Sequence, residues 1–421
     1  MLRFSVRVLL VIVGSLLVRD AIAQSSSIEG NTVSRTVRGK VVPSERDEQE
    51  SLFNYYFQDQ KLKYETQFEK LKTSASVPKW RIPYSADIHP QVAGGLSGAT
   101  GRRGYASYSP LSTYDRAFNG GRESASSYET QRVMGTQRTL LPGMRLRRNN
   151  EGWEGYCSGF TASTIRHPEP IRAVDAGTVG GTPGVIFQPS DIKALLSSVY
   201  NRTTDDSYLY LAPPSASDGG PNMGTFHLAL TNYIGAAGHP IGFDRTKGRA
   251  PWNNPIYAYE VNSIRDAGSS DHLHYKTVDL MLTYSFYGSD QGQQTDTQTG
   301  EIRGNQKQQM ALRYNLALDD DGRIVGGQAL TYNGYFLWIP LYPVQGTADG
   351  KSPGNPYLDV KKVLALARAS ALPETQKRFD EANIGPKETA ETRSASAVGN
   401  QGPSSIRGES RTETASAAAS R

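Results

Sequence analysis

Residues 153–163 read Trp-Glu-Gly-Tyr-Cys-Ser-Gly-Phe-Thr-Ala-Ser and contain the single cysteine of the 421-residue chain, Cys157. The glycine on either side permits close backbone approach, and the small residues that follow suit a tightly packed helix beginning at the thiol. A helix start presents partial positive charge and free N–H groups, which favour a thiolate and lower its pKa. The backbone N–H of Cys157 is a candidate donor to an oxyanion, and the indole of Trp153 either donates as well or only packs. This stretch predicts a helix with a nucleophilic thiol at its N-terminus.

The first 23 residues have the pattern of an export signal. Arg3 and Arg7 precede an apolar run from Val8 to Val18, and Ala21-Ile22-Ala23 supplies small residues at the cleavage positions. The competing interpretation is a membrane span, but the run is too short to cross a bilayer and no later stretch reaches that length. We therefore predict a secreted or periplasmic protein that starts at Gln24 and has a formal charge of +3, compared with +5 for the whole chain.

An exported protein with one cysteine has no internal disulfide to form, so Cys157 is a buried filler, an intermolecular bridge or a reactive thiol. The predicted base is His227, one of six histidines, because its neighbours in Phe-His-Leu-Ala-Leu keep an imidazole neutral near pH 7. A hydrogen-bonded core histidine is the alternative interpretation. Asp244 lies 17 residues later, at the end of a predicted strand, and is the predicted orienting group. Its alternative role is a surface ion pair with Arg245.

Other residues remain open as partners of the thiol. Asn253 and Asn254, in Trp-Asn-Asn-Pro at residues 252–255, have side-chain carbonyls that suit the orienting role, or they form a turn. A third arrangement uses His167 or Asp191, which lie nearer Cys157 in the sequence.

The hydrophobic pattern predicts an α+β fold, in which the cysteine-bearing helix and further helices pack against an antiparallel sheet. It also divides the chain into four parts. After the signal at 1–23, residues 24–150 form a polar N-terminal region of mostly loops. It contains one amphipathic helix at 45–72, which is either docked on the core or part of a removable pro-segment. Residues 151–372 form the catalytic domain. Residues 373–421 are predicted to be disordered, because Phe379 is their only aromatic residue.

Within the catalytic domain, apolar spacing predicts helices after Ser190 as N-cap, from 223 to 234 between Asn222 and Gly235, and from 360 to 367. The apolar side chains of Phe226, Leu228 and Leu230 also follow the alternating pattern of a strand, so a strand remains an alternative prediction for this segment. The period changes to two in four later segments, which predicts strands of an antiparallel sheet at 256–261, 278–284, 310–318 and 335–339.

Three aspartates followed by Gly322 separate two of these strands at 319–322. The spacing lacks the later ligands and the terminal glutamate of a calcium loop, so a hairpin turn is predicted and no metal or cofactor is expected. Basic residues are scattered, apart from a cluster at Arg145, Arg147 and Arg148, and they lack interleaved aromatic residues. Nucleic acid is therefore not an expected partner.

Several of these segments together resemble the transglutaminase elicitor family, secreted transglutaminases of oomycetes with bacterial relatives. The similarity lies in the segment around Cys157, the helix at 191–196, residues 226–235, Asp244 and the Trp-Asn-Asn-Pro segment. It extends over about residues 105–370, with further matches at 109–115, 326–327 and 336–338.

The resemblance implies a papain-like or transglutaminase-like catalytic arrangement and acyl transfer from a protein glutamine, through a thioester on Cys157, to a lysine side chain or small amine. The resemblance implies that Cys157 is the nucleophile, and His227 and Asp244 match marked positions of the family. Asn254 departs from the family, which usually has glutamine before this proline. Two alternatives remain open. One is a secreted cysteine hydrolase, a peptidase or cell-wall amidase, and the other is a noncatalytic surface or adhesion protein.

Overall fold

The computed structural model describes most of the chain between residues 35 and 383. The described ranges are 35–37, 40–42, 45–57, 60–91, 94–98, 109–135, 155–201, 208–212, 221–246, 252–287, 306–331, 334, 336–340, 344 and 346–383. All of them belong to one compact unit, residues 1–386. The predicted export signal, Trp153, the basic cluster at 145–148 and the tail beyond Asn383 lie outside the described residues.

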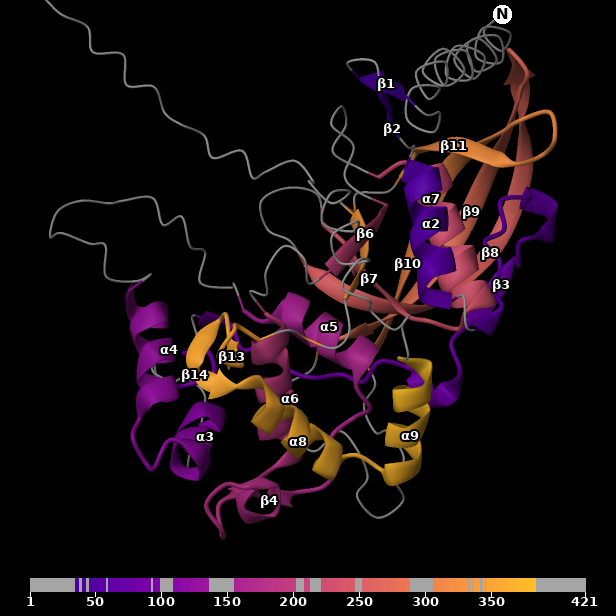
Figure 1. The fold of residues 1–421 in the computed structure, drawn as a ribbon. Helices are drawn as coiled ribbons and strands as arrows, with labels where there is room; N and C mark the ends of the chain where they lie inside the picture. Colours follow the sequence, from indigo (N-terminus) through magenta and orange to yellow (C-terminus); the bar gives the residue numbers. More distant parts are fainter. Residues whose placement is uncertain are drawn as a thin grey trace, which may run out of the picture. The chain divides into compact units, whose positions relative to one another are not determined.

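An eight-stranded antiparallel sheet is the main element of the fold, as the alternating segments predicted (Figure 1). Seven strands run in the order β11-β10-β9-β8-β7-β12-β6. The eighth, β3, pairs with β8 beyond the segment that pairs with β7. The strands are β3 (Ser74–Ser76), β6 (Tyr208–Ala212), β7 (Ile241–Asp244), β8 (Asn253–Ser270), β9 (Leu273–Phe286), β10 (Gln306–Leu318), β11 (Ile324–Ala329) and β12 (Phe336–Pro340).

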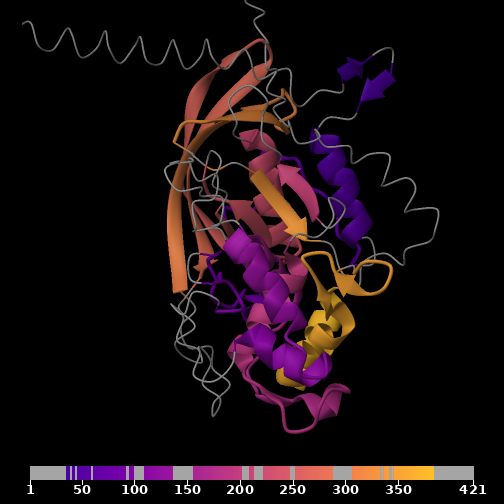
Figure 2. The ribbon, with the colours of Figure 1, turned by 90° about the vertical axis from the view of Figure 1, so that its left-hand side faces the viewer.

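One hydrophobic core lies between this sheet and the helices α2 (Glu45–Phe57) and α7 (Met223–Ala229), the latter continuing as a π-helix, η8 (Leu230–Ala236). Figure 2 shows the long strands on one side of α7 and α2 on the other. The side chain of Asn222 caps α7 by accepting from two backbone N–H groups, which favours the helix over the strand that alternation also allowed. The helix crosses β11 at two glycines, because a Cβ at Gly327 would lie 2.6 Å from the backbone nitrogen of Gly224.

A second core is built mainly from helices: α3 (Pro110–Phe118), α4 (Ser124–Gly135), α5 (Cys157–Arg166), α6 (Pro189–Tyr200) and α8 (Val360–Ser370). Their apolar side chains, such as Leu111, Leu195 and Val363, pack with Trp338 of β12. The cysteine-bearing helix α5 crosses α6 at Gly159, where a Cβ would overlap the carbonyl oxygen of Ser197. The remaining elements are small: β1 (Arg35–Val37), β2 (Lys40–Val42), η3 (Phe68–Lys70), η4 (Lys79–Arg81), β4 (Val174–Asp175), η6 (Ala176–Val179), β5 (Ile186–Phe187), β13 (Lys351–Ser352), β14 (Asn355–Asp359) and α9 (Pro373–Ala382).

The N-terminal region differs from its prediction in two respects. The amphipathic helix ends at Phe57 and not at residue 72, although Tyr64, in irregular backbone, and Phe68, the first residue of η3, still reach the first core. Two helices, α3 and α4, occupy a region predicted to be mostly loops, and Ser109 caps the first of them. Both differences arise because tertiary packing, and not local periodicity, selects the backbone in these segments.

Two further corrections concern helix boundaries. The N-cap of α6 is Gln188 and not Ser190, and its backbone N–H donates to the carboxylate of Asp191 at 2.9 Å. The predicted disordered tail begins too early, because residues 373–382 form α9. The buried ring of Phe379 packs against Trp80 with ring centroids 5.4 Å apart, a long-range contact that supplies the missing stabilisation.

The Asp-Asp-Asp-Gly segment forms the predicted hairpin turn between β10 and β11. Gly322 has a φ of 76° and donates its N–H to the carbonyl of Asp319 at 2.9 Å. The carboxylate of Asp319 accepts the backbone N–H groups of Asp321 and Arg323. Within the described ranges, no helix is long and apolar enough to cross a bilayer.

Candidate active site

Cys157 is the first residue of α5, as predicted from the small residues around it. The preceding residue, Tyr156, donates its N–H to the carbonyl of Ile88 at 2.6 Å, which ties the start of the helix to the segment at 84–91. Gly155 is required here because a Cβ at this position would overlap the same Ile88 carbonyl oxygen. The sequence thus places the thiol at a helix start that is held from outside by a neighbouring segment.

The sulfur is enclosed mainly by apolar groups. Cys157 is 8% exposed and packs with Tyr84, Ala86, Ile88 and Phe160. Two partly exposed rings complete the cluster, Trp252 and Tyr287, which stack on each other with centroids 5.6 Å apart. These rings mark the side of the cluster that is nearest to solvent.

Asn253 supplies a polar group that faces the sulfur. Its Nδ2 lies 3.9 Å from Sγ of Cys157, within the range of a hydrogen bond to sulfur. The other side of the amide accepts the indole N–H of Trp338 at 2.9 Å, which fixes the amide with its N–H group toward the thiol. The indole lies over β7 at Gly242, where a Cβ would meet the ring at 2.5 Å. The sheet therefore presents one oriented amide donor to the cysteine.

Asp244 lies beside Asn253 as its antiparallel partner across β7 and β8. The residue is fully buried, and its Oδ1 accepts N–H groups from Thr246 and Trp252 at 3.1 and 2.8 Å. Arg245, the ion-pair partner that the sequence also allowed, donates Nε–H to Asn254 and lies over the ring of Trp252, and its positive charge acts to lower the pKa of Asp244.

Burial raises the pKa of the Cys157 thiol, and the negative charge of Asp244 raises it further. Hydrogen bonds from the backbone and side chain of Asn253 and from the backbone of Ser158 act in the opposite direction. Burial also raises the pKa of Asp244, against the hydrogen bonds from Thr246 and Trp252. The sequence prediction of a lowered thiol pKa is therefore wrong for this arrangement, since desolvation outweighs the helix start.

The structure does not bring His227 to the cysteine. His227 lies on α7 in the first core, where its Nδ1 and the hydroxyl of Tyr314 are 2.7 Å apart. Burial lowers the pKa of His227 to about 4, so the ring is neutral near pH 7, as its apolar neighbours predicted. None of its contacts within the described residues involves Cys157 or Asp244.

The other sequence candidates lie apart from the sulfur. His167 follows the C-terminus of α5, about 15 Å of helix from Cys157, and its Nε2 is 2.8 Å from the hydroxyl of Tyr200. Asp191 closes the first turn of α6. His89, which the sequence did not single out, follows Ile88 in the segment that covers the thiol, and it has a buried side chain and a positive φ of 47°. The unusual backbone of His89 becomes visible only in the folded chain.

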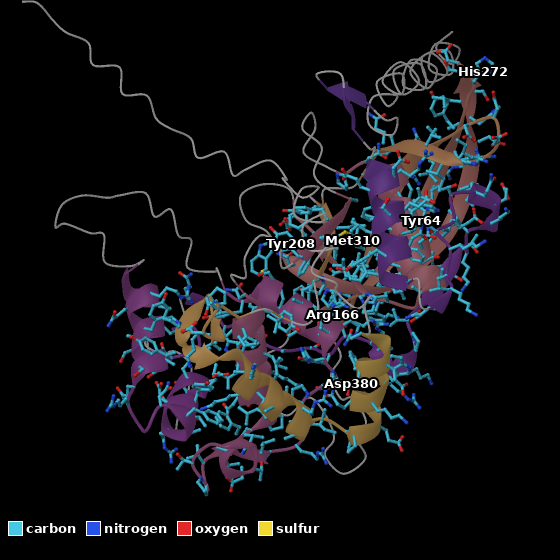
Figure 3. All side chains as sticks on the ribbon, viewed as in Figure 1. Tyr64, Arg166, Tyr208, His272, Met310 and Asp380 are labelled. Atoms are coloured by element: carbon cyan, nitrogen blue, oxygen red, sulfur yellow. The ribbon has the colours of Figure 1, made fainter. Side chains whose placement is uncertain are left out.

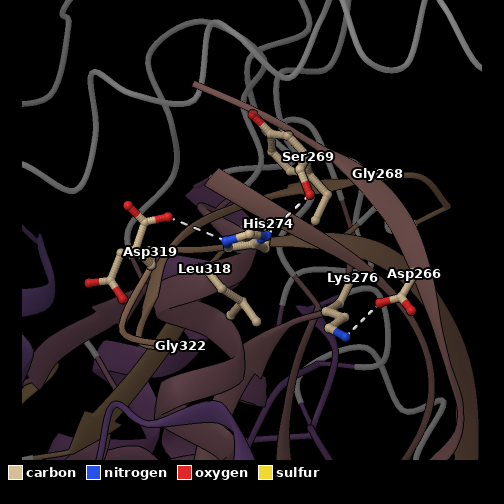
Figure 4. Close-up of a pocket in the computed structure, with 10 residues that line it drawn as sticks. Asp266, Gly268, Ser269, His274, Lys276, Leu318, Asp319 and Gly322 are labelled. Atoms are coloured by element: carbon tan, nitrogen blue, oxygen red, sulfur yellow. Dashed lines mark hydrogen bonds and ion pairs between the residues drawn. The ribbon is translucent and has the colours of Figure 1, made fainter. Parts of the chain in front are cut away.

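A separate hollow of about 270 Å³ lies at the far end of the β8–β9 hairpin (Figure 4). Several of its polar groups contact one another: His274 lies 3.3 Å from Asp320 and 3.1 Å from Ser269, and Lys276 contacts Asp266 at 2.6 Å. Within the described ranges, no three His, Cys, Asp or Glu side chains are grouped to hold a metal ion. Its lining does not include Cys157, the single cysteine of the chain, so the hollow is not a second candidate for thioester chemistry.

No family model matches the chain, and no curated protein matches it in sequence. Among solved structures, the GP42 transglutaminase from Phytophthora sojae superposes with a TM-score of 0.58 at 18% sequence identity. The match covers 80% of this chain and 99% of that chain. At this identity the likeness concerns the fold, and the chain has the mixed helical and antiparallel-sheet fold of that transglutaminase, in agreement with the class predicted from the sequence.

Proposed function

We propose that the protein is an acyltransferase of the transglutaminase type, with Cys157 as nucleophile. The observation that carries this proposal is the contact between Sγ of Cys157 and the oriented amide of Asn253, next to the buried carboxylate of Asp244. Thioester chemistry uses a thiol nucleophile, a proton acceptor and a fixed N–H donor, and these three residues are candidates for those roles. The likeness of the fold to a transglutaminase and the family resemblance of the sequence support the same reaction.

In the proposed reaction, the sulfur of Cys157 attacks the side-chain carboxamide carbon of a protein glutamine. Asp244 accepts the thiol proton and passes it to the departing nitrogen, so that the C–N bond breaks, ammonia leaves and a thioester remains. The amine of a lysine side chain or small molecule then attacks the thioester carbon and gives a proton to Asp244. The new amide C–N bond forms, the C–S bond breaks, and Asp244 returns the proton to the released sulfur. Asn253 Nδ2–H and the Ser158 backbone N–H stabilise negative charge on sulfur or on the carbonyl oxygen.

The sequence hypothesis assigned the proton transfer to His227 and the orienting role to Asp244. Asp244 is the better candidate for the base because its charge acts directly on the thiol, whereas His227 donates to or accepts from Tyr314 in another core. Substitution of each residue separately tests this assignment.

Transfer and hydrolysis share the thioester and differ in what resolves it. The apolar enclosure by Ile88, Trp252 and Tyr287 limits water at the sulfur, which favours an amine whose carbon chain packs against the rings. This enclosure supports the proposal of transfer over the alternative of a cysteine hydrolase.

The test is incorporation of a labelled amine into a glutamine-containing protein, with release of ammonia measured in the same reaction. The wild-type protein should do both, and Cys157→Ala should do neither. Ammonia release without incorporation would indicate the hydrolase, and the absence of both from a folded wild-type protein would favour the noncatalytic alternative.

We also propose that the protein acts after export, with residues 1–23 removed. The apolar run flanked by Arg7 and Arg19 supports this proposal. Mass spectrometry of the mature protein from an exporting host should give Gln24 as the first residue, and retention of Met1 in the exported fraction would contradict it.

A further inference from the structure

The side chain of Arg81 is a buried cation without an acceptor among the described residues. It lies in η4, is 3% exposed, and its Nε and Nη2 atoms have no hydrogen-bond partner there. Burial, followed by the positive charge of Arg166, lowers the pKa of Arg81 to about 9. An uncompensated buried charge of this kind is costly, and native proteins pair such groups with an acceptor.

The two atoms without partners form one edge of the guanidinium, along which the N–H bonds of Nε and Nη2 run parallel. Arg132 shows how the same edge is used elsewhere in this chain. Its Nε and Nη2 each donate to one oxygen of Glu129 at 2.8 Å. The open edge of Arg81 therefore fits a group with two adjacent oxygens, a carboxylate or phosphate, better than a single carbonyl.

The neighbours of Arg81 add positive charge and donors. The guanidinium of Arg166, at the C-terminus of α5, donates through Nε and Nη2 to the carbonyl of Pro340 and through Nη1 to Asn383. Figure 3 labels Arg166 among the side chains of the molecule. No carboxylate among the described residues contributes to the pKa of Arg81, so the described chain supplies no counter-charge to it.

His239 completes the surroundings as a neutral ring. Its Nε2 lies 3.2 Å from Nη1 of Arg166, which can only donate, so Nε2 accepts and the proton is on Nδ1. Nδ1–H donates to the carbonyl of Pro240 at 2.6 Å. Burial and the charges of Arg81 and Arg166 hold the pKa of His239 well below its usual range.

We propose that Arg81 binds a small oxyanion, a carboxylate or phosphate, through its Nε and Nη2 edge, near Arg166, whose positive charge adds to that of Arg81. The anion supplies the acceptors that Arg81 lacks and neutralises part of the charge shared with Arg166. Its position joins η4 to the end of α5, opposite the end that carries Cys157, so binding stabilises the fold and is separate from the proposed acyl transfer.

The experiment is thermal unfolding of the full-length protein in Tris chloride, with phosphate or acetate replacing chloride at constant ionic strength. Phosphate, acetate or both should raise Tm saturably by a few degrees, because a ligand that binds only the native state stabilises it. Their relative midpoints identify which chemistry the site prefers. Chloride offers a single acceptor atom and should have no saturable effect.

Arg81→Met removes the guanidinium while keeping an apolar side chain of similar length. It should abolish the increase in Tm caused by phosphate and acetate. Arg81→Lys keeps the charge but not the parallel edge and should weaken apparent affinity at least tenfold. The matched control is Arg368→Met, which removes an exposed guanidinium that already pairs with Asp380 and should leave the response unchanged.

Two results would overturn the proposal: a wild-type Tm that follows ionic strength alone, or the same saturable response in wild type and Arg81→Met. If Arg81→Met fails to fold, ³¹P line broadening of phosphate with wild type and Arg81→Lys provides the comparison. Equal broadening by the two proteins, or none by wild type, would equally reject the site.

Discussion

The amide of Asn253 is held by a chain of single-residue requirements. Gly242 leaves room for the indole of Trp338 over β7, the indole N–H fixes the amide oxygen, and the amide nitrogen then faces Cys157. Asparagine amides rotate readily between two orientations, of which only one offers a donor to the sulfur. Trp338 is therefore a positioning residue that acts through Asn253.

Separate substitutions of Asn253 and Trp338 should distinguish the role of the hydrogen-bond donor from that of the residue that positions it. Asn253→Ala removes the donor, and kcat for amine incorporation should fall about 10²- to 10³-fold. Trp338→Phe keeps a ring but removes the N–H, and kcat should fall about 10-fold with little change in KM. Trp80→Phe, which alters an indole packed on Phe379, is the control and should retain wild-type kcat. An unchanged kcat in Asn253→Ala would reject its role.

The rate of iodoacetamide alkylation, measured as a function of pH, tests how nearby charge affects the pKa of the thiol. The rate reports one site, because Cys157 is the single cysteine. The midpoint for wild type should lie above that of an ordinary thiol, because burial and Asp244 raise the pKa. Asp244→Asn removes the repulsion, so the midpoint should move to lower pH while amine incorporation falls.

His227→Gln provides the comparison for Asp244→Asn. It should leave the alkylation midpoint in place, because its contacts lie in the other core. A shift of the midpoint in His227→Gln, with none in Asp244→Asn, would restore the histidine as the partner of the thiol.

At the level of elements, the position of the thiol depends on how closely α5 approaches α6. Gly159 allows this approach, since a side chain there would meet the backbone of Ser197, which cannot rotate away. The β7–β8 pairing brings Asp244 and Asn253 to the same end of the sheet. The site thus forms where a helix start meets the end of a strand pair.

Gly159→Ala should lower the free energy of unfolding by about 3 kcal/mol or more, because α5 and α6 must separate to accommodate the methyl group. Chemical denaturation with circular dichroism provides the measurement. Gly177→Ala is the control, since its nearest contact is Pro183 at 3.0 Å on an exposed turn, and it should cost about 1 kcal/mol or less. Equal effects of the two substitutions would contradict the close crossing.

At the level of the whole molecule, two cores meet along β12 and share the sheet between them. The N-terminal helix α2 belongs to the first core, because Phe53 and Phe57 pack edge-on against Tyr233 of η8. Buried histidines lie in both parts of the molecule, and their titration couples the stability of the fold to pH.

The docking of α2 predicts different outcomes for two truncations. A protein that starts at Glu45 should retain the wild-type Tm, whereas one that starts after Phe57 should unfold or aggregate because its core loses buried aromatic rings. Differential scanning calorimetry of both proteins checks this expectation. Full stability without α2 would instead be the behaviour of a removable pro-segment.

The buried histidines predict loss of stability in acid. The pKa of His227 is lowered to about 4 and that of His167 to about 3, so between these values and about 6.5 the unfolded chain binds protons that the native chain does not. The contribution of these two rings to the free energy of unfolding is complete above pH 6.5. It is lost as the pH falls toward the native pKa values, by about 1.4 kcal/mol per pH unit for each ring. Urea unfolding between pH 7 and 4 should show this slope, and His227→Gln should reduce it.

Local sequence by itself determined the helix at Cys157, the capped helix after Asn222, the turn at residues 319–322 and the strands β8, β9, β10 and β12, whereas β3, β6 and β11 were not predicted. Apolar periodicity, caps and turn residues act within a few neighbours, so they are visible without the fold. The same rules missed α9, whose stability depends on a distant ring, Trp80.

Only the tertiary structure decided which residues meet the sulfur and what its surroundings do to its pKa. Asn253, one of several candidates in the sequence, reaches Cys157 through strand register and the room left by Gly242, while His227 points into another core. Contacts between strands and helices distant in sequence set both the partners and the burial of the thiol. Because desolvation depends on everything that surrounds an atom, the raised pKa of Cys157 has no signature in its own sequence neighbours.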